Sequence, residues 1–159
     1  MNTNKQPDPL IKAERIKKLP EKTFSHPLNQ NSEISGVSLS EAVGLQRIGF
    51  HLAKIPPGKE SFIYHSHEFE EEFIYILSGK GIAQIDNQEY EVGEGDFMGF
   101  PTPSVAHHLK NPFEQDLVYI MGGERREYEI ADFPRLQKRI FRNGQQVQIA
   151  DLDNLKPFM

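Results

Sequence analysis

The chain has 159 residues, a length suited to one domain, and its 18 Lys and Arg against 23 Asp and Glu give a formal net charge of -5. This acidic balance argues against nucleic acid or an anionic membrane as the partner. The sequence contains no cysteine. Disulfides and thiol chemistry are therefore excluded, and a metal site would need histidine and carboxylate ligands.

The N-terminal part of the chain is polar and rich in turn residues. The start MNTNKQPDPL lacks the apolar core of a signal peptide, and the apolar run FIYIL is too short to span a bilayer, so we expect a soluble, cytoplasmic protein. Residues 1–9 are expected to be disordered. Residues 10–19 fit a short amphipathic helix and an extended arm equally well, and residues 20–36 predict a loop.

From about Gly44 onwards, strand patterns recur roughly every ten residues. Near-alternating apolar runs are expected to form strands over residues 45–55, 61–67, 72–79, 81–85, 89–92, 97–101, 104–111 and 116–123. A hairpin turn is expected at residues 86–88. This spacing is typical of an all-β sandwich or barrel. The charged stretch 124–137 reads as irregular, and Asn143-Gly144 predicts a second hairpin. We therefore divide the chain into an N-terminal arm (1–43), a barrel core (44–123) and a C-terminal extension (124–159).

Two histidines separated by one residue introduce the candidate site. If residues 61–67 form a strand, His65 and His67 project from the same face, which is a suitable start for a metal site. Four glutamates follow. Glu72 opens the next strand and is the preferred carboxylate ligand, Glu71 is the fallback, and Glu68 and Glu70 are expected to face water.

A third imidazole could come from the pair His107-His108, because one member of the pair must face the interior of an alternating strand. The pattern alone does not choose between them. His26 and His51 are expected to be structural or exposed. Arg47, on the strand before His65, is a candidate to hold a substrate carboxylate, but surface exposure is the simpler interpretation.

The spacing of these residues resembles the two motifs of the cupin family. The first motif runs through Gly58, His65, His67, Glu72 and Gly79, with one extra residue in its first spacer. The second runs through Gly95, Pro101-Thr102-Pro103, His107 and Asn111, with Pro103 in place of the expected glycine and one extra residue before the histidine. The resemblance covers about residues 44–123. It implies a double-stranded β-helix (jelly-roll) barrel, and it selects Glu72 over Glu71 and His107 over His108.

The resemblance also implies a function and partners. The metal ligands would be His65, His67, Glu72 and His107, holding one divalent transition metal (Fe, Mn, Ni, Cu, Co or Zn). The expected function is a metal-dependent enzyme, a dioxygenase or an isomerase, acting on a small organic molecule inside the barrel. The alternative is a non-catalytic binding or sensing protein. Cupins commonly dimerise through N-terminal strands, so residues 10–43 are expected to form the interface of a homodimer.

Overall fold

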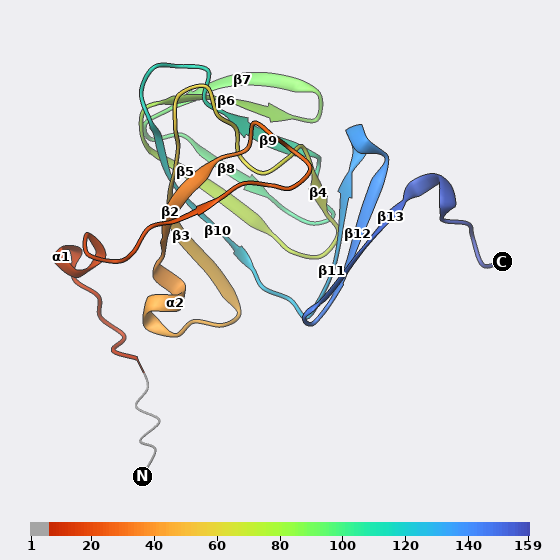
Figure 1. The fold of residues 1–159 in the computed structure, drawn as a ribbon, viewed down its shortest axis with the longest axis horizontal. Coiled ribbons are helices and arrows are strands. Elements are labelled where there is room, and N and C mark those ends of the chain that lie inside the picture. The colour runs from red at the N-terminus through yellow and green to blue at the C-terminus, as the bar shows by residue number, and fades with distance from the viewer. Residues whose placement is uncertain (1–6) are drawn as a thin grey trace, which may run out of the picture.

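The computed structural model describes residues 7–159, which fold into three antiparallel sheets (Figure 1). The largest sheet has the strand order β1-β2-β3-β10-β5-β8. Its strands are Lys22–Phe24 (β1), Ile34–Ser38 (β2), Ile48–Ile55 (β3), Leu117–Glu124 (β10), Glu72–Ser78 (β5) and Phe97–Phe100 (β8). The chain is thus mainly β, as its alternating apolar runs predict.

Two smaller sheets complete the architecture. The order β7-β6-β9 joins Gln88–Gly93 (β7), Lys80–Ile85 (β6) and His107–Lys110 (β9). The order β13-β12-β11-β4 joins Gln146–Asp151 (β13), Lys138–Asn143 (β12), Tyr128–Phe133 (β11) and Ser66–His67 (β4). The short helices are Ala13–Ile16 (α1) and Leu39–Val43 (α2), with 3-10 turns at Pro134–Leu136 and Leu152–Asn154. No helix within residues 7–159 is long and apolar enough to cross a membrane.

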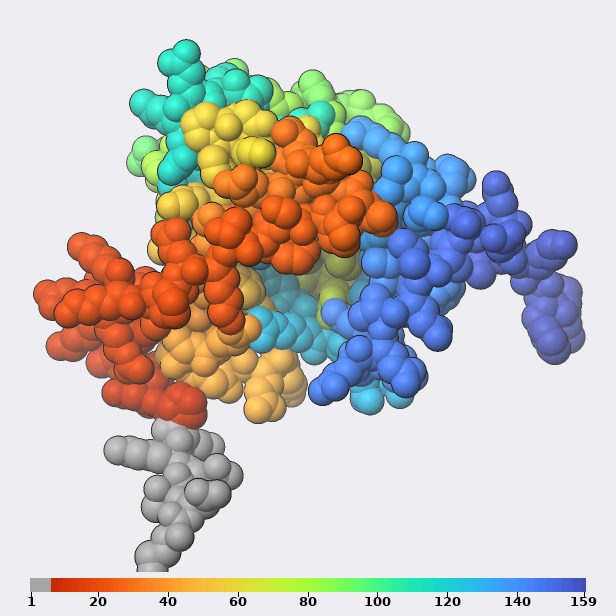
Figure 2. Space-filling model, in the orientation of Figure 1, coloured from red at the N-terminus to blue at the C-terminus, as the bar shows by residue number. Residues whose placement is uncertain are grey.

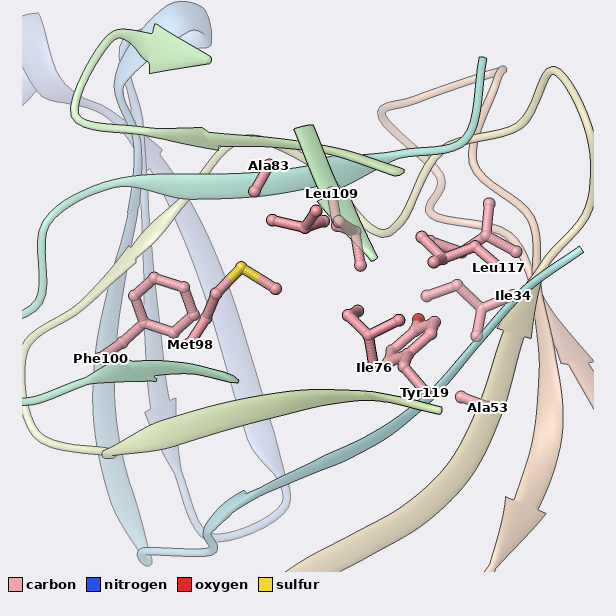
Figure 3. Packing of buried hydrophobic residues seen from close by; sticks show 11 residues of the cluster. Ile34, Ala53, Ile76, Ala83, Met98, Phe100, Leu109, Leu117 and Tyr119 are labelled. Atoms are coloured by element: carbon pink, nitrogen blue, oxygen red, sulfur yellow. The ribbon is translucent and has the colours of Figure 1, made fainter. Parts of the chain in front are cut away.

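The hydrophobic core lies between the six-stranded sheet and the β7-β6-β9 sheet. In Figure 3, Ala83 and Leu109 face Ile76 and Tyr119 from the opposite side of the barrel. Ile76 and Leu117 are fully buried. Each large apolar side chain transferred from water in this way stabilises the fold by about 1.5–3 kcal/mol. This packing holds the two walls that carry the candidate site.

Several predicted strands and both predicted hairpins are present. Strands β6 and β7 are joined by Asp86 and Asn87, which have φ values of 45° and 66°. Two consecutive positive φ values define the tight turn that matches the twist of a hairpin, and Asp and Asn tolerate them. The second hairpin joins β12 to β13 across Asn143 and Gly144.

The prediction of a strand over residues 61–67 is wrong for most of that range. Only Ser66–His67 forms a strand, and His65 makes an isolated bridge to His107. The reason lies in the hydrogen bonds of this segment. Ser61 and His65 donate to the β9 carbonyl oxygens of Leu109 and His107 at 2.8 and 3.1 Å, but the Phe62 carbonyl between them accepts from the Asn29 side chain at 3.0 Å, so the ladder is interrupted.

Two regions that the sequence predicts as irregular contain strands. Residues 20–36 hold β1 and the start of β2, which pair with each other and extend the large sheet next to β3. Residues 124–137 hold β11, which pairs with both β12 and β4. The proposed division at residues 43 and 123 and the proposed homodimer through residues 10–43 stay predictions.

Candidate functional site

Four side chains from separate elements converge at one end of the barrel. His67 lies on β4, Glu72 begins β5, and His107 begins β9 opposite the bridge residue His65. The ring of His65 lies 4.8 Å from that of His67 and 4.6 Å from that of His107, measured between centroids. Phe100 stacks on His107 at 3.7 Å, nearly parallel, and so fixes the plane of that ring.

The three imidazoles all direct Nε2 toward one carboxylate oxygen. Glu72 Oε2 lies 3.1 Å from Nε2 of His107, 3.3 Å from that of His67 and 3.8 Å from that of His65. Ligand atoms held at right angles about 2.1 Å from a shared ion would be about 3 Å apart. The spacing of this four-residue cluster therefore fits a transition-metal ion.

The protonation of the imidazole rings also fits a bound metal ion. Nδ1 of His65 lies 2.6 Å from the Ile63 carbonyl oxygen, and Nδ1 of His107 lies 3.1 Å from that of Val105. A carbonyl oxygen only accepts, so Nδ1 carries the proton in both rings and Nε2 of the neutral ring offers a lone pair. These lone pairs face Glu72, which is also an acceptor. A cation placed between them removes the repulsion.

The electrostatics favour the forms that bind metal. Burial lowers the pKa of His65, although hydrogen bonding to Glu72 opposes this effect. Burial would raise the pKa of Glu72, but the surrounding imidazoles of His107, His65 and His67 hold that pKa well below its usual range. Burial also disfavours protonation of His67, but the nearby Glu72 and Glu129 carboxylates outweigh it and raise the pKa. At neutral pH the site thus offers a carboxylate and at least one neutral imidazole.

The alternative candidates lie elsewhere. Glu71 is exposed and bonds through its backbone to Glu124. His108 points away from the cluster toward Glu60, whose Oε2 lies 3.7 Å from its Nε2. Glu68 is exposed, as expected, but the expectation that Glu70 faces water is wrong. Glu70 is buried because it accepts hydrogen bonds from the backbone of Arg126 and the side chain of Arg142.

A buried carboxylate that the sequence analysis missed supports the cluster from behind. Glu129, on β11, is 5% exposed, and its Oε1 lies 3.4 Å from Nδ1 of His67. The same oxygen accepts the backbone N–H groups of Glu68 and Phe69, at 3.0 and 3.3 Å. Glu129 thereby positions both the His67 ring and the loop that leads to Glu72.

A pocket opens onto the cluster. Its volume is about 210 Å³. Part of the cluster (His65, Glu72 and His107) lines it. Its apolar lining includes Phe62, Phe73, Ile74, Tyr119 and Met121, and its other polar lining includes His51, Glu124 and Arg125. Figure 2 shows a hollow on this face between the orange N-terminal segment and the blue C-terminal strands. A small molecule entering the pocket would contact Glu72.

The polar residues that line the pocket are not the ones that the sequence predicts. Arg125 and His51 line it, although His51 was expected to be structural or exposed, and Arg125 lies in a stretch that gave no signal. Arg47 is exposed and does not line this pocket. His26 packs edge-on against Phe133, with ring centroids 5.5 Å apart, which agrees with a structural role.

Comparison with known proteins identifies the family to which this fold and site belong. The model of the Cupin domain matches residues 51–123. An uncharacterized protein of Methanocaldococcus jannaschii is 37% identical over 59 residues. That match covers 37% of this chain and 46% of the relative, so this chain spans less than half the length of the curated protein that it matches.

Two solved structures resemble the whole fold. A proposed sugar phosphate isomerase from Acidithiobacillus ferrooxidans is 37% identical, with a TM-score of 0.91, and the match covers 94% of this chain and 96% of that one. A sugar phosphate isomerase of the cupin superfamily from Silicibacter pomeroyi is 23% identical, with a TM-score of 0.72, covering 76% of this chain and 78% of that one. The second likeness concerns the fold alone. With its β-barrel and a His/Glu cluster typical of cupin metal sites, the chain belongs to the cupin superfamily.

Proposed function

We propose that this protein binds one divalent transition metal through His65, His67, Glu72 and His107, and that it isomerises a small phosphorylated sugar in the adjoining pocket. The observation that carries the metal proposal is the convergence of three imidazole Nε2 atoms on Glu72 Oε2 at 3.1–3.8 Å. Both ring nitrogens of His67 are buried without an aligned hydrogen bond among the described residues. Coordination would satisfy its Nε2.

The isomerase reaction is supported by similarity along almost the entire chain. The A. ferrooxidans protein is 37% identical to this chain over 94% of this chain's length, and it is the source of the proposed substrate class. A bound metal would supply a Lewis acid that polarises the carbonyl or an adjacent hydroxyl of the sugar. Within the cupin fold many reactions occur, so the reaction rests on the pocket and its residues rather than on the barrel.

The protein's own residues then have two tasks. The apolar wall of Phe62, Phe73 and Met121 excludes water from the reacting carbons. An aldose–ketose isomerisation moves a proton between neighbouring carbons without any oxidant, and it needs a group that accepts and returns this proton. That group would act beside Glu72, where the metal would hold the sugar oxygens, whereas His51 lies beside Arg125, with its Nε2 3.4 Å from Arg125 Nη2.

The test is a proton-exchange assay. Metal-loaded protein is incubated in deuterium oxide with a panel of aldose and ketose phosphates, and interconversion and deuterium uptake at carbon are followed by proton NMR. His107→Gln should lose both the metal and the interconversion. The matched control His26→Gln, outside the pocket, should retain activity.

Two outcomes would replace this assignment. Oxygen uptake by the iron-loaded protein without isomerisation would place the chain among the dioxygenases. Tight binding of the sugar phosphate without turnover in any metal form would identify a binding or sensing protein.

A further inference from the structure

Two nitrogen-bearing side chains lie together at the end of the pocket away from Glu72. Arg125 Nη2 is 3.4 Å from Nε2 of His51. Both residues line the pocket, and about a third of the Arg125 side chain is exposed. A guanidinium is permanently charged and carries a fork of donors that matches a phosphate or carboxylate group.

The backbone keeps this end open. A Cβ at Gly49 would lie 3.3 Å from Arg125 Nε and 3.4 Å from His51 Nε2. Glycine at this position therefore leaves space directly in front of both nitrogens. Gly49 pairs with Gly123 of β10, and Gly123 pairs with Glu72 of β5, so the three residues form one row across the sheet.

The row sets the distance between the two ends of the pocket. Neighbouring strands lie about 4.8 Å apart, so Gly49 is roughly 10 Å from Glu72. A molecule whose oxygen atoms contact the cluster at one end would place a group several bonds away beside Arg125. This separation suits a short sugar chain that ends in an anionic ester.

We propose that Arg125, with His51 beside it, forms an oxyanion subsite that holds the phosphate group of the substrate. This proposal rests on the proposed function and adds the residue that selects phosphorylated over neutral sugars. Glu41 competes for the same guanidinium, because its Oε1 lies 3.7 Å from Arg125 Nη2. That ion pair is more than half exposed at Glu41 and is therefore weak, so an incoming phosphate can replace it.

The direct test measures binding of inorganic phosphate by calorimetry to the metal-free, full-length protein, since a bound metal would itself take up phosphate. Arg125→Gln should weaken phosphate binding roughly tenfold or more. Glu41→Gln should strengthen it, because it removes the competing carboxylate. The matched control is Arg47→Gln. Arg47 is exposed, and its carbonyl oxygen accepts the Arg125 backbone N–H at 2.8 Å, so it tests a nearby positive charge outside the pocket.

Gly49→Ala provides a second, geometric variant. The added methyl group should weaken phosphate binding while circular dichroism and metal affinity stay unchanged. The subsite proposal is overturned if Arg125→Gln and Arg47→Gln bind phosphate as the wild type does, or if the wild type binds none. Loss of isomerisation with intact, Arg125-dependent phosphate binding would overturn the proposed function alone. Equal turnover of phosphorylated and neutral sugars would overturn the subsite alone.

Discussion

Glu129 Oε1 lies 3.4 Å from Nδ1 of His67, across the ring from the Nε2 atom that faces Glu72. The imidazole thus lies between two carboxylates. One of them belongs to the four-residue cluster, and the other comes from the C-terminal strand β11. A carboxylate behind a ligand imidazole fixes its orientation and raises its basicity.

Glu129→Gln should therefore weaken metal binding by roughly 10–100-fold. The amide oxygen can still accept the N–H groups of Glu68 and Phe69, so the loop should stay in place. Competition with a chromophoric chelator measures the affinity. Glu127→Gln removes an exposed charge two residues earlier and should have no effect. Equal affinities in the two variants would show that Glu129 does not act on His67.

The buried carboxylate of Glu70 ties the loop before β5 to the C-terminal hairpin. Arg142 is its charged partner, and the Glu70 side chain is 8% exposed. Arg142→Met leaves a buried charge unpaired and should lower the free energy of unfolding by about 2–4 kcal/mol, reduced somewhat by the partial exposure of Arg142.

A second arginine on β12 offers a matched control for this pair. Arg139 binds Asp132 through two hydrogen bonds of 2.7 and 2.8 Å, but both partners are near the surface. Arg139→Met should cost no more than about 1 kcal/mol. Urea unfolding compares the two variants, and equal losses would refute the distinction between a buried and a surface pair.

Asn111, the last residue of the second motif, acts in folding. It is fully buried, donates to the carbonyl oxygens of Ile55 and Gln115 at 2.8 and 2.7 Å, and accepts from the backbone of Phe113. Asn111→Asp places a carboxylate against two carbonyls and should destabilise the protein by on the order of 3 kcal/mol. Thermal unfolding of the metal-free form measures this loss. Exposed Asn143→Asp should be nearly neutral, and a similar loss there would contradict the interpretation.

His108 introduces acid sensitivity that is separate from metal binding. Burial is the main cause that lowers its pKa from 6.5 to about 4. The unfolded chain therefore binds a proton at a pH where the folded chain does not. The stability contribution is complete above about pH 6.5 and is lost as the pH falls toward about 4. The loss amounts to at most about 3 kcal/mol.

His108→Gln, which does not titrate, should flatten this part of the stability profile. Urea unfolding of the chelator-treated protein at pH 7.5 and pH 4.5 measures the effect. The drop in stability between the two conditions should be smaller in the variant. An unchanged drop would mean that other groups cause the acid sensitivity.

The strands that bring the candidate site together could be read from the sequence where apolar alternation is regular. The run around Ile74 and Ile76 follows the period-2 rule, and the motif spacing selected Glu72. The His107-His108 strand was found without alternation, because both histidines are buried. The segment before His65 was misassigned, because the Asn29 side chain binds the Phe62 carbonyl and interrupts the pairing, a long-range effect that periodicity does not contain.

The residues around the cluster were harder to find. Glu129 occupies a buried position of β11 where the pattern requires an apolar residue, so the charge hid the strand. Glu70 looked solvated because its partner Arg142 is 72 residues away. Arg125 had no local signal, since its place in the pocket depends on the path of the chain after β10.

The metal content of the purified protein tests the central claim most directly. Elemental analysis of protein prepared without a chelating tag should find about one transition-metal ion per chain. His65→Ala, Glu72→Ala and His107→Ala should each lose it, whereas His26→Ala should keep it. A wild-type protein that ignores added Fe, Mn, Ni, Co, Cu and Zn, or a His107→Ala variant with full metal content, would contradict the account.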